Sequence, residues 1–292
     1  MEKRASTSKT ILVTGATGTT GGEVTRQLLE GGHRVRVLAR GPEAASKLPE
    51  GAQAVIGDHD DVASLDAAFA GVEAAYAVTP VSLRGVAWMR NLIDAARRAG
   101  VRRFVKMSGM TASPDSPSVL IRDHASADEY LRASGIPYTI LRPNSFMQNQ
   151  LGSIGTIKAQ GAFYQATGEA QQSVIDVVDV AAVAVKALTE PGHEQQTYVL
   201  TGPESLGFHE IAAKIGRTIG KPVAYVPITT EAAEQGMKGS GLPDWLAHDI
   251  AEFFGSIATG AFAGTTDDVQ RVLGRPPASF DQFLARHAAM FQ

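Results

Sequence analysis

The stretch Lys9-Thr10-Ile11-Leu12-Val13-Thr14-Gly15-Ala16-Thr17-Gly18-Thr19-Thr20-Gly21-Gly22 decides the fold of this chain. A short apolar strand leads directly into three glycines spaced three residues apart, and a helical pattern follows. Gly15 permits a tight turn, Gly18 lets a pyrophosphate approach the backbone, and Gly21 lets the helix pack closely on the strand. Such turns also form plain strand-helix connections, but the flanking strand and helix favour phosphate binding at the helix N-terminus. The predicted dinucleotide contacts here are Gly15, Thr17, Gly18, Thr19, Thr20 and Gly21.

The composition excludes several classes of function. The 292 residues carry 27 Lys and Arg against 30 Asp and Glu, a net charge of -3, and no basic run would follow a nucleic-acid backbone. Since the chain has no cysteine, disulfides, thiolate nucleophiles and cysteine-ligated metals are excluded. The seven histidines lack metal-ligand spacing, and no nucleophilic serine motif is present. We therefore expect no nucleic-acid partner and no metal site.

The polarity of the chain bears on its location. Residues 1–9 are polar and lack the apolar core of a signal peptide, which predicts a flexible tail and a cytoplasmic protein. The most apolar stretch, 174–188, is interrupted by Asp176, Asp179 and Lys186, so we expect no membrane-spanning segment. We expect a monomer or a homodimer.

Strand and helix patterns alternate over the first half of the chain. Short apolar strands separated by helices are typical of a parallel sheet that is buried on both faces. The pattern predicts an α/β fold with a Rossmann-type doubly wound parallel sheet, which binds ligands at the carboxyl ends of its strands. The predicted strands are 11–13, 34–39, 54–56, 74–78, 104–107 and 138–141, and the predicted helices are 22–30, 62–70, 85–99 and 122–134, with a short helix from Pro42.

The pattern changes after residue 150. Glycines and isolated apolar residues cover 151–172, and the chain is mostly helical in pattern from Phe208 onward. We expect a NAD(P)-binding Rossmann domain over 10–150, with returns to it at about 173–201 that include Val174-Ile175, helix 180–188 and strand 197–200. Residues 151–172 and 202–292 are expected to form a smaller, mostly helical C-terminal lobe that binds the substrate.

The end of the second predicted strand indicates which nucleotide binds. A NAD site usually has an acidic residue there, about twenty residues past the glycines, to bind the ribose hydroxyls. Here the strand ends in Arg40, and Lys47 follows one short helix later. Arginine can bind a 2′-phosphate and stack on adenine, so NADP(H) is favoured, with Arg40 and Lys47 as predicted cofactor contacts. Arg40 could also be an ordinary solvated arginine. Asp58 is placed either to approach the adenine or to cap the next helix.

At this point four motifs carry a family resemblance: Val13-Thr14-Gly15-Ala16-Thr17-Gly18, Gly57-Asp58, Ser134-Gly135-Ile136-Pro137-Tyr138-Thr139-Ile140-Leu141-Arg142-Pro143 and Gly274-Arg275-Pro276-Pro277. Together they resemble the NmrA-like group of atypical short-chain dehydrogenases/reductases, over nearly the whole chain. Within that group the chain is most similar to NAD(P)H:quinone oxidoreductases and triphenylmethane reductase, because His124 stands where isoflavone-reductase-like relatives carry lysine. The ordinary Tyr-x-x-x-Lys signature is missing, since none of the six tyrosines has lysine four residues on. The resemblance implies an NADPH-dependent reductase of a quinone, azo or triarylmethane acceptor.

Two residues are candidates for the chemistry. Ser108 follows strand 104–107, where this fold places residues that face the nicotinamide, although it could be a plain strand-to-loop serine. His124 could orient the acceptor or supply a proton, or it could only hydrogen-bond near the cofactor. Several predicted acceptor contacts are Met or aromatic residues, and such residues at helix spacing lie in a hydrophobic core more often than in a pocket. The predicted further cofactor contacts are Thr79, Pro80 and Pro143, and the predicted acceptor contacts are Asn144, Phe146, Met147, Trp245 and Phe253.

Two other classes of function fit the same fold. One is an NADP(H)-sensing regulator, as some NmrA-like proteins are, and nucleotide binding without NADPH oxidation would indicate it. The other is an isomerase or dehydratase that recycles its nucleotide, and product formation without net NADPH consumption would indicate it. For the reductase we expect a small aromatic or quinone-like acceptor, which the sequence does not identify.

Overall fold

The computed structural model describes residues 9–291, and most of the tail expected over 1–9 lies outside these described residues. Lys9, the last residue of that expected tail, forms an ion pair with Glu73.

The chain divides into two compact units, each built from several segments. Unit 1 comprises Met1–Ser108, Ser126–Leu141 and Val180–Tyr198, and unit 2 comprises Gly109–Ala125, Arg142–Asp179 and Val199–Gln292. The sequence predicts that the chain changes domain at about residues 150, 173 and 201. The chain passes between the two units more often than that, and the predicted domains stay a proposal.

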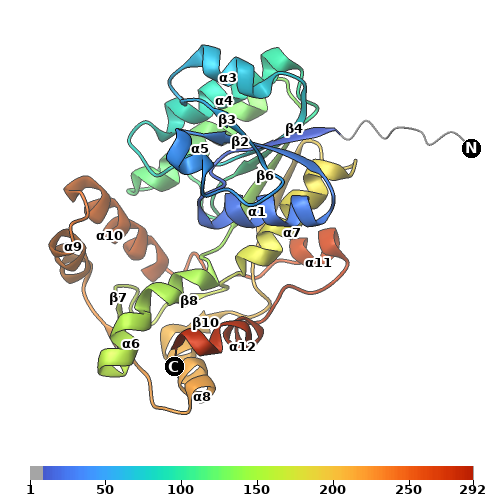
Figure 1. Cartoon of the computed structure of the whole chain (residues 1–292). Coiled ribbons are helices and arrows are strands. Elements are labelled where there is room, and N and C mark those ends of the chain that lie inside the picture. Colours follow the sequence, from blue (N-terminus) through green and yellow to red (C-terminus); the bar gives the residue numbers. More distant parts are fainter. Residues whose placement is uncertain (1–8, 292) are drawn as a thin grey trace, which may run out of the picture. The chain divides into compact units, whose positions relative to one another are not determined.

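Within residues 9–291 a seven-stranded parallel sheet organises unit 1 (Figure 1), and it confirms the predicted Rossmann-type fold. The strand order is β3-β2-β1-β4-β5-β6-β9, so the chain proceeds to one side of β1 and then returns to the other side. In doubly wound sheets the ligand binds at the carboxyl ends of the strands where the order reverses, which here is at β1 and β4. The strands are β1 (Thr10–Val13), β2 (Arg34–Ala39), β3 (Gln53–Ile56), β4 (Val72–Ala77), β5 (Arg103–Met107), β6 (Tyr138–Pro143) and β9 (Gln196–Leu200).

Helices cover both faces of this sheet, with α3 and α4 on one face and α1 and α7 on the other (Figure 1). In α4, Met89, Leu92, Ile93 and Ala96 recur at helical spacing and are all buried. They share one hydrophobic core with Phe69 of α3 and with apolar strand residues. The helices are α1 (Thr19–Glu30), α2 (Pro42–Ala45), α3 (Val62–Phe69), α4 (Gly85–Ala99), α5 (Val119–Ala133) and α7 (Val177–Thr189).

Unit 2 has a core of its own, in which Phe163, Phe208 and Tyr225 pack together. The ring centroids of Phe163 and Tyr225 lie 5.6 Å apart, and those of Phe208 and Tyr225 lie 5.3 Å apart. The unit pairs β7 with β11 in parallel and β8 with β10 in antiparallel orientation. Its elements are η1 (Met147–Ser153), α6 (Ile154–Gln160), β7 (Ala162–Gln165), β8 (Gln171–Gln172), β10 (Leu206–Gly207), α8 (Phe208–Ile219), β11 (Ala224–Pro227), α9 (Thr230–Gly239), α10 (Asp244–Ala258), α11 (Asp268–Leu273) and α12 (Phe280–Phe291).

Several details differ from the sequence-based expectations. Helix α1 begins at Thr19 rather than Gly22, because Gly18 is already the extended N-cap residue. The expected return of Val174-Ile175 to the sheet is wrong, since Ile175 forms an isolated bridge with Phe146 instead. The two paired strands β7 and β11 fall in segments where the sequence indicates neither strand nor helix.

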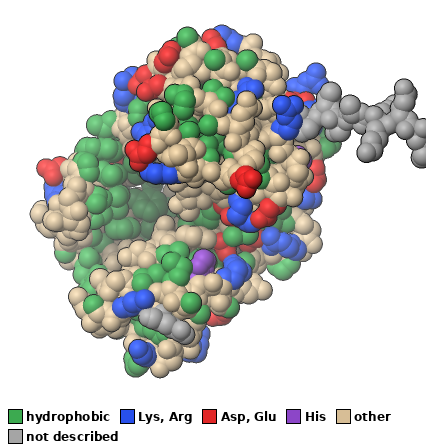
Figure 2. Space-filling view, viewed as in Figure 1, with side chains coloured by type: hydrophobic (Ala, Val, Ile, Leu, Met, Phe, Trp, Pro, Cys, Tyr) green, Lys and Arg blue, Asp and Glu red, His purple; other side chains and the backbone are tan. Residues whose placement is uncertain are grey.

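The surface agrees with the balanced composition. Figure 2 shows Lys and Arg side chains interspersed with Asp and Glu over the visible face. No helix in the described part of the chain is both long and apolar enough to cross a membrane.

The packing of α1 on β1 depends on Gly21. A Cβ atom at this position would lie 2.4 Å from the carbonyl oxygen of Gly15 and 2.7 Å from that of Thr14. Both atoms belong to the backbone at the end of β1, so no flexible side chain can move aside. The helix can therefore approach the strand this closely only if Gly21 has no side chain.

We predict that Gly21→Ala lowers the free energy of unfolding by about 2 kcal/mol or more, because the methyl group forces α1 away from β1. Gly255→Ala in α10 is the control, since nothing lies within 4 Å of its added Cβ and alanine is favoured over glycine in helices. Denaturant unfolding followed by circular dichroism measures both variants. A Gly21→Ala variant as stable as the wild type would contradict this account of the packing.

Candidate functional site

The end of β1 is tied to the end of β4 by one side chain. The Thr14 hydroxyl donates to the carbonyl oxygen of Val78 at 2.7 Å and accepts from the backbone N–H of Val78 at 2.9 Å. Gly15 follows with φ +65°, a left-handed conformation that favours glycine. A Cβ there would also lie 2.6 Å from Cγ1 of Val78. The tight turn predicted at Gly15 is therefore enforced by both its backbone and its neighbour.

The first turn of α1 is open to an anion. Gly18 is the N-cap residue and offers no side chain to accept from the first N–H groups of the helix, and no acidic residue stands in the first turn. Thr17, Gly18 and Thr19 are exposed, whereas Thr20 is buried. A Cβ at Gly18 would meet only the Gly15 carbonyl oxygen, at 3.3 Å, so glycine here keeps the backbone accessible from outside. These residues fit a pyrophosphate, which would bind the free N–H groups.

The ends of β2 and β3 hold the residues expected to choose the nucleotide. Arg40 is exposed, and within residues 9–291 its guanidinium makes no hydrogen bond or ion pair with another residue. Lys47, in contrast, pairs with Glu43 at 2.7 Å. Arg40 is therefore the cation left available for a phosphate, while Lys47 already has a carboxylate partner.

Asp58 and Asp61 divide the two roles that the sequence left open. The Asp61 carboxylate caps α3 by accepting from the backbone N–H of Ala63 at 3.0 Å. The Asp58 carboxylate accepts from the N–H of Asp60 at 2.8 Å and is otherwise exposed. Helix capping therefore belongs to Asp61, and a contact of Asp58 with the adenine stays a prediction.

His59 is buried next to Asp58 in the sequence. Its ring lies 5.5 Å from that of Trp88, and its carbonyl oxygen accepts from Asn91 at 2.8 Å. Burial lowers the pKa of His59, and the Arg40 charge adds to this shift while Asp58 opposes it. The imidazole is therefore neutral near pH 7, and the positive charge at this edge comes from Arg40.

The carboxyl ends of β4 and β5 carry the residues expected near the nicotinamide. Thr79 and Pro80 follow β4 and are half-buried. Ser108 follows β5, is 4% exposed, and its N–H donates to the Leu141 carbonyl at 2.8 Å. Its hydroxyl donates to Asp128, a residue that sequence reasoning missed. The available signal was Lys106, a charged side chain inside an apolar strand, because such a residue needs a buried partner.

In unit 2, His124 lies in the first half of α5 and is half-buried. The imidazole ring lies beside Gly109, where a Cβ would be 3.4 Å from Cδ2 of His124. The start of α5 is held by buried Asp249 of α10, which accepts from the N–H of Leu120 at 3.2 Å and from the Ser118 hydroxyl at 3.1 Å. Asp249 also accepts from the N–H of Val119. Asp249, which sequence reasoning also missed, therefore fixes the helix that carries His124.

The residues expected to contact the acceptor have different surroundings within unit 2. The Asn144 amide donates to Ser173 at 2.7 Å and to the Phe262 carbonyl at 2.8 Å, so its polar atoms are used inside the unit. Met147 is fully buried in the hydrophobic core. Phe253 packs edge-on against Phe262 at 5.5 Å. Phe146 and Trp245 are half-buried, and Pro143 is buried with its carbonyl accepting from Met110. A contact of any of them with the acceptor or cofactor stays a prediction.

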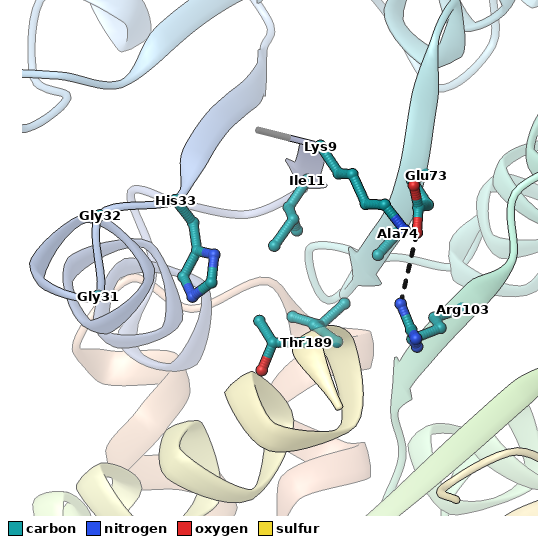
Figure 3. Close-up of a pocket in the computed structure, with 10 residues that line it drawn as sticks. Lys9, Ile11, Gly31, Gly32, His33, Glu73, Ala74, Arg103 and Thr189 are labelled. Atoms are coloured by element: carbon teal, nitrogen blue, oxygen red, sulfur yellow. Dashed lines mark hydrogen bonds and ion pairs between the residues drawn. The ribbon is translucent and has the colours of Figure 1, made fainter. Parts of the chain in front are cut away.

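A separate cavity of about 400 Å³ lies at the amino ends of β1, β4 and β5, away from the glycine turn (Figure 3). Figure 3 shows Lys9 and Arg103 directed toward Glu73, and Nη1 of Arg103 lies 3.5 Å from the Glu73 carboxylate. Both cations thus share one carboxylate. None of the predicted site residues lines this cavity. Within residues 9–291, no group of His, Asp or Glu side chains is arranged to hold a metal ion.

Comparison with known proteins identifies the family of this chain. The sequence matches the model of the NmrA-like family over residues 7–276. The chain belongs to the NmrA-like family. This NmrA-like chain is 42% identical over 282 residues to the NAD(P)H azoreductase of Xenophilus azovorans, covering 96% of the chain and 99% of the azoreductase.

Two solved structures share the fold. One is the Escherichia coli NADPH-dependent quinone oxidoreductase in complex with NADPH, with 28% identity, a TM-score of 0.85, and coverage of 94% of this chain and 99% of that one. The other is the Citrobacter triphenylmethane reductase in complex with NADP(H), with 27% identity, a TM-score of 0.84 and the same coverage. The resemblance inferred from the sequence motifs is therefore confirmed.

Proposed function

We propose that this chain is an NADPH-dependent oxidoreductase that transfers a hydride to a small electrophilic acceptor, such as a quinone, an azo compound or a triarylmethane dye. The observation that carries the proposal is the uncapped first turn of α1, with exposed Arg40 directly after the neighbouring strand β2. The names of the azoreductase, quinone oxidoreductase and triphenylmethane reductase relatives support the acceptor class. When bound, NADPH supplies a hydride from its nicotinamide ring.

The residues of the chain divide the remaining work. Gly15, Gly18 and the first N–H groups of α1 would hold the pyrophosphate, and Arg40 would hold the 2′-phosphate. Ser108 would mark the nicotinamide end, on the opposite side of the glycine turn. An acceptor that is already electrophilic needs mainly to be aligned and shielded from water. His124 is the candidate proton donor for acceptors that become oxyanions on reduction.

We predict that NADPH binds at least about tenfold more tightly than NADH, a difference of about 1.4 kcal/mol, because Arg40 makes charge-assisted contacts with the 2′-phosphate. Arg40→Ala should remove most of this preference and leave NADH affinity nearly unchanged. Lys158→Ala is the control, since Lys158 is an exposed cation of α6 and is not among the predicted cofactor contacts. Calorimetric titration with both nucleotides measures the affinities of all three proteins. Equal NADPH and NADH affinities in the wild type would refute the assignment of Arg40.

The proposed function is tested by NADPH oxidation with quinones, azo dyes and triarylmethane dyes. For a quinone we predict that His124→Ala lowers kcat/KM about a hundredfold, because a proton donor is lost. For a triarylmethyl cation, which takes hydride without a proton, the loss should be small. His248→Ala is the control, because His248 is exposed and contacts Glu234. NADPH affinity should be nearly the same in all three proteins.

Two outcomes would change the assignment. NADPH binding without oxidation by any acceptor would overturn the reductase and favour the regulatory alternative. Oxidation of NADPH with equal rates in wild type and His124→Ala for every acceptor would keep the reductase and reduce His124 to a structural residue.

A further inference from the structure

Three buried polar side chains meet at the carboxyl end of β5 in unit 1. Nζ of Lys106 lies 2.8 Å from Oδ1 of Asp128, and Oγ of Ser108 lies 3.0 Å from Oδ2 of the same carboxylate. Lys106 also donates to the Met107 carbonyl at 3.2 Å. The side chains of Lys106 and Asp128 are 1% and 0% exposed. Removing such a pair from water costs several kcal/mol per ion, so stability alone does not account for it.

The donors and acceptors in this cluster fix the direction of the Ser108 hydrogen bond. An ammonium group has only donors, and an ionised carboxylate has only acceptors. The Asp128 carboxylate accepts from the Lys106 ammonium through Oδ1 and from the Ser108 hydroxyl through Oδ2. The single hydrogen of Ser108 must therefore point at Oδ2 of Asp128. Only the lone pairs of Ser108 remain for any other group.

The position of Ser108 along the sheet indicates which group of the cofactor could donate a hydrogen bond to the Ser108 hydroxyl oxygen. Arg40 follows β2, on one side of the glycine turn, and Ser108 follows β5, two strands from β1 on the other side. A dinucleotide held at the turn by its pyrophosphate extends in both directions along this edge. If its 2′-phosphate lies toward Arg40, its nicotinamide lies toward β5. The nicotinamide carries a carboxamide, whose NH₂ group is a donor.

We propose that Ser108 accepts a hydrogen bond from the carboxamide NH₂ of the nicotinamide, and that Asp128 is the positioning residue that turns the Ser108 hydroxyl into an acceptor. This inference rests on the proposed function, because it places the nicotinamide end of the cofactor at Ser108. It also assigns Ser108 to cofactor orientation and excludes it as a proton donor, since its hydrogen is held by Asp128. Any proton that the acceptor requires comes from another group.

Asp128→Asn distinguishes this arrangement from a general structural role. An asparagine has one oxygen and one NH₂ group, and Lys106 can only donate, so the oxygen turns to Lys106 and the NH₂ to Ser108. Ser108 then accepts from the NH₂ group that the substitution introduces, and its own hydrogen points outward. Asp128→Asn therefore reverses the polarity that Ser108 offers to the ligand, without changing the size of either side chain.

The test compares NADP⁺ with its 3-acetylpyridine analogue, in which a methyl group replaces the NH₂ of the carboxamide. Calorimetric titration gives the ratio of the two dissociation constants, and no turnover is needed. The wild type should bind NADP⁺ about tenfold more tightly than the analogue, as one hydrogen bond in a buried site predicts. Ser108→Ala and Asp128→Asn should both lose most of this preference. Ser108→Thr, which keeps the hydroxyl, should retain it.

Asp179→Asn is the matched control. Asp179 is a buried carboxylate in unit 2 with its own ion pair, 2.7 Å from Arg275, and it should keep the wild-type preference when neutralised. Should Asp128→Asn not fold, Ser108→Ala against Ser108→Thr still decides the role of Ser108. A preference unchanged in Ser108→Ala, absent from the wild type, or lost equally in Asp179→Asn would overturn the inference. A wild type that shows the preference but reduces no acceptor would refute only the proposed function.

Discussion

The close approach of α1 to β1 is the constraint on which the rest of this structure depends. Gly21 permits that approach, because any side chain there would overlap the backbone of Thr14 and Gly15. Once α1 is held there, its first N–H groups face the carboxyl edge of the sheet, and Gly18 leaves them without a side-chain acceptor. The turn lies between the two halves of the sheet's carboxyl edge. Arg40 lies toward β3, and Ser108 lies toward β6. One packing requirement thus positions the proposed phosphate site, with Arg40 and Ser108 on its two sides.

Buried carboxylates then set the chemistry of individual side chains. Asp128 holds Lys106 and fixes the Ser108 hydroxyl as an acceptor. Asp249 supplies the acceptors at the start of α5, the helix that carries His124. In the proposed function, Ser108 and His124 must keep their positions relative to the reacting atoms, because misplacement by about 1 Å costs a large factor in rate. Asp128 orients the Ser108 hydroxyl, and Asp249 holds the first turn of α5.

The glycine turn between β1 and α1 could be predicted from the sequence because all of its parts lie within residues 9–22, where strand, glycine and helix patterns are local. The place of Arg40 directly after β2 could be predicted for the same reason, since this strand is clear in the sequence. The partners of Ser108 and of α5 could not, because Asp128 is 20 positions from Ser108 and Asp249 is 131 positions from Ser118. Only the charge of Lys106 within an apolar strand hinted at such a partner. The predicted return of Val174-Ile175 to the sheet was wrong because two apolar residues do not show which strand they pair with. Ile175 pairs with Phe146 outside the seven-stranded sheet.

In the proposed function, the chain moves a hydride directly from the nicotinamide of bound NADPH to the acceptor. The most direct measurement uses NADPH deuterated at C4 on one face or the other, with a triarylmethyl acceptor whose reduced carbon does not exchange with water. Mass spectrometry of the product should find one deuterium on that carbon for one labelled face and none for the other, because a fixed cofactor presents a single face. Product without deuterium from either labelled cofactor would contradict direct hydride transfer.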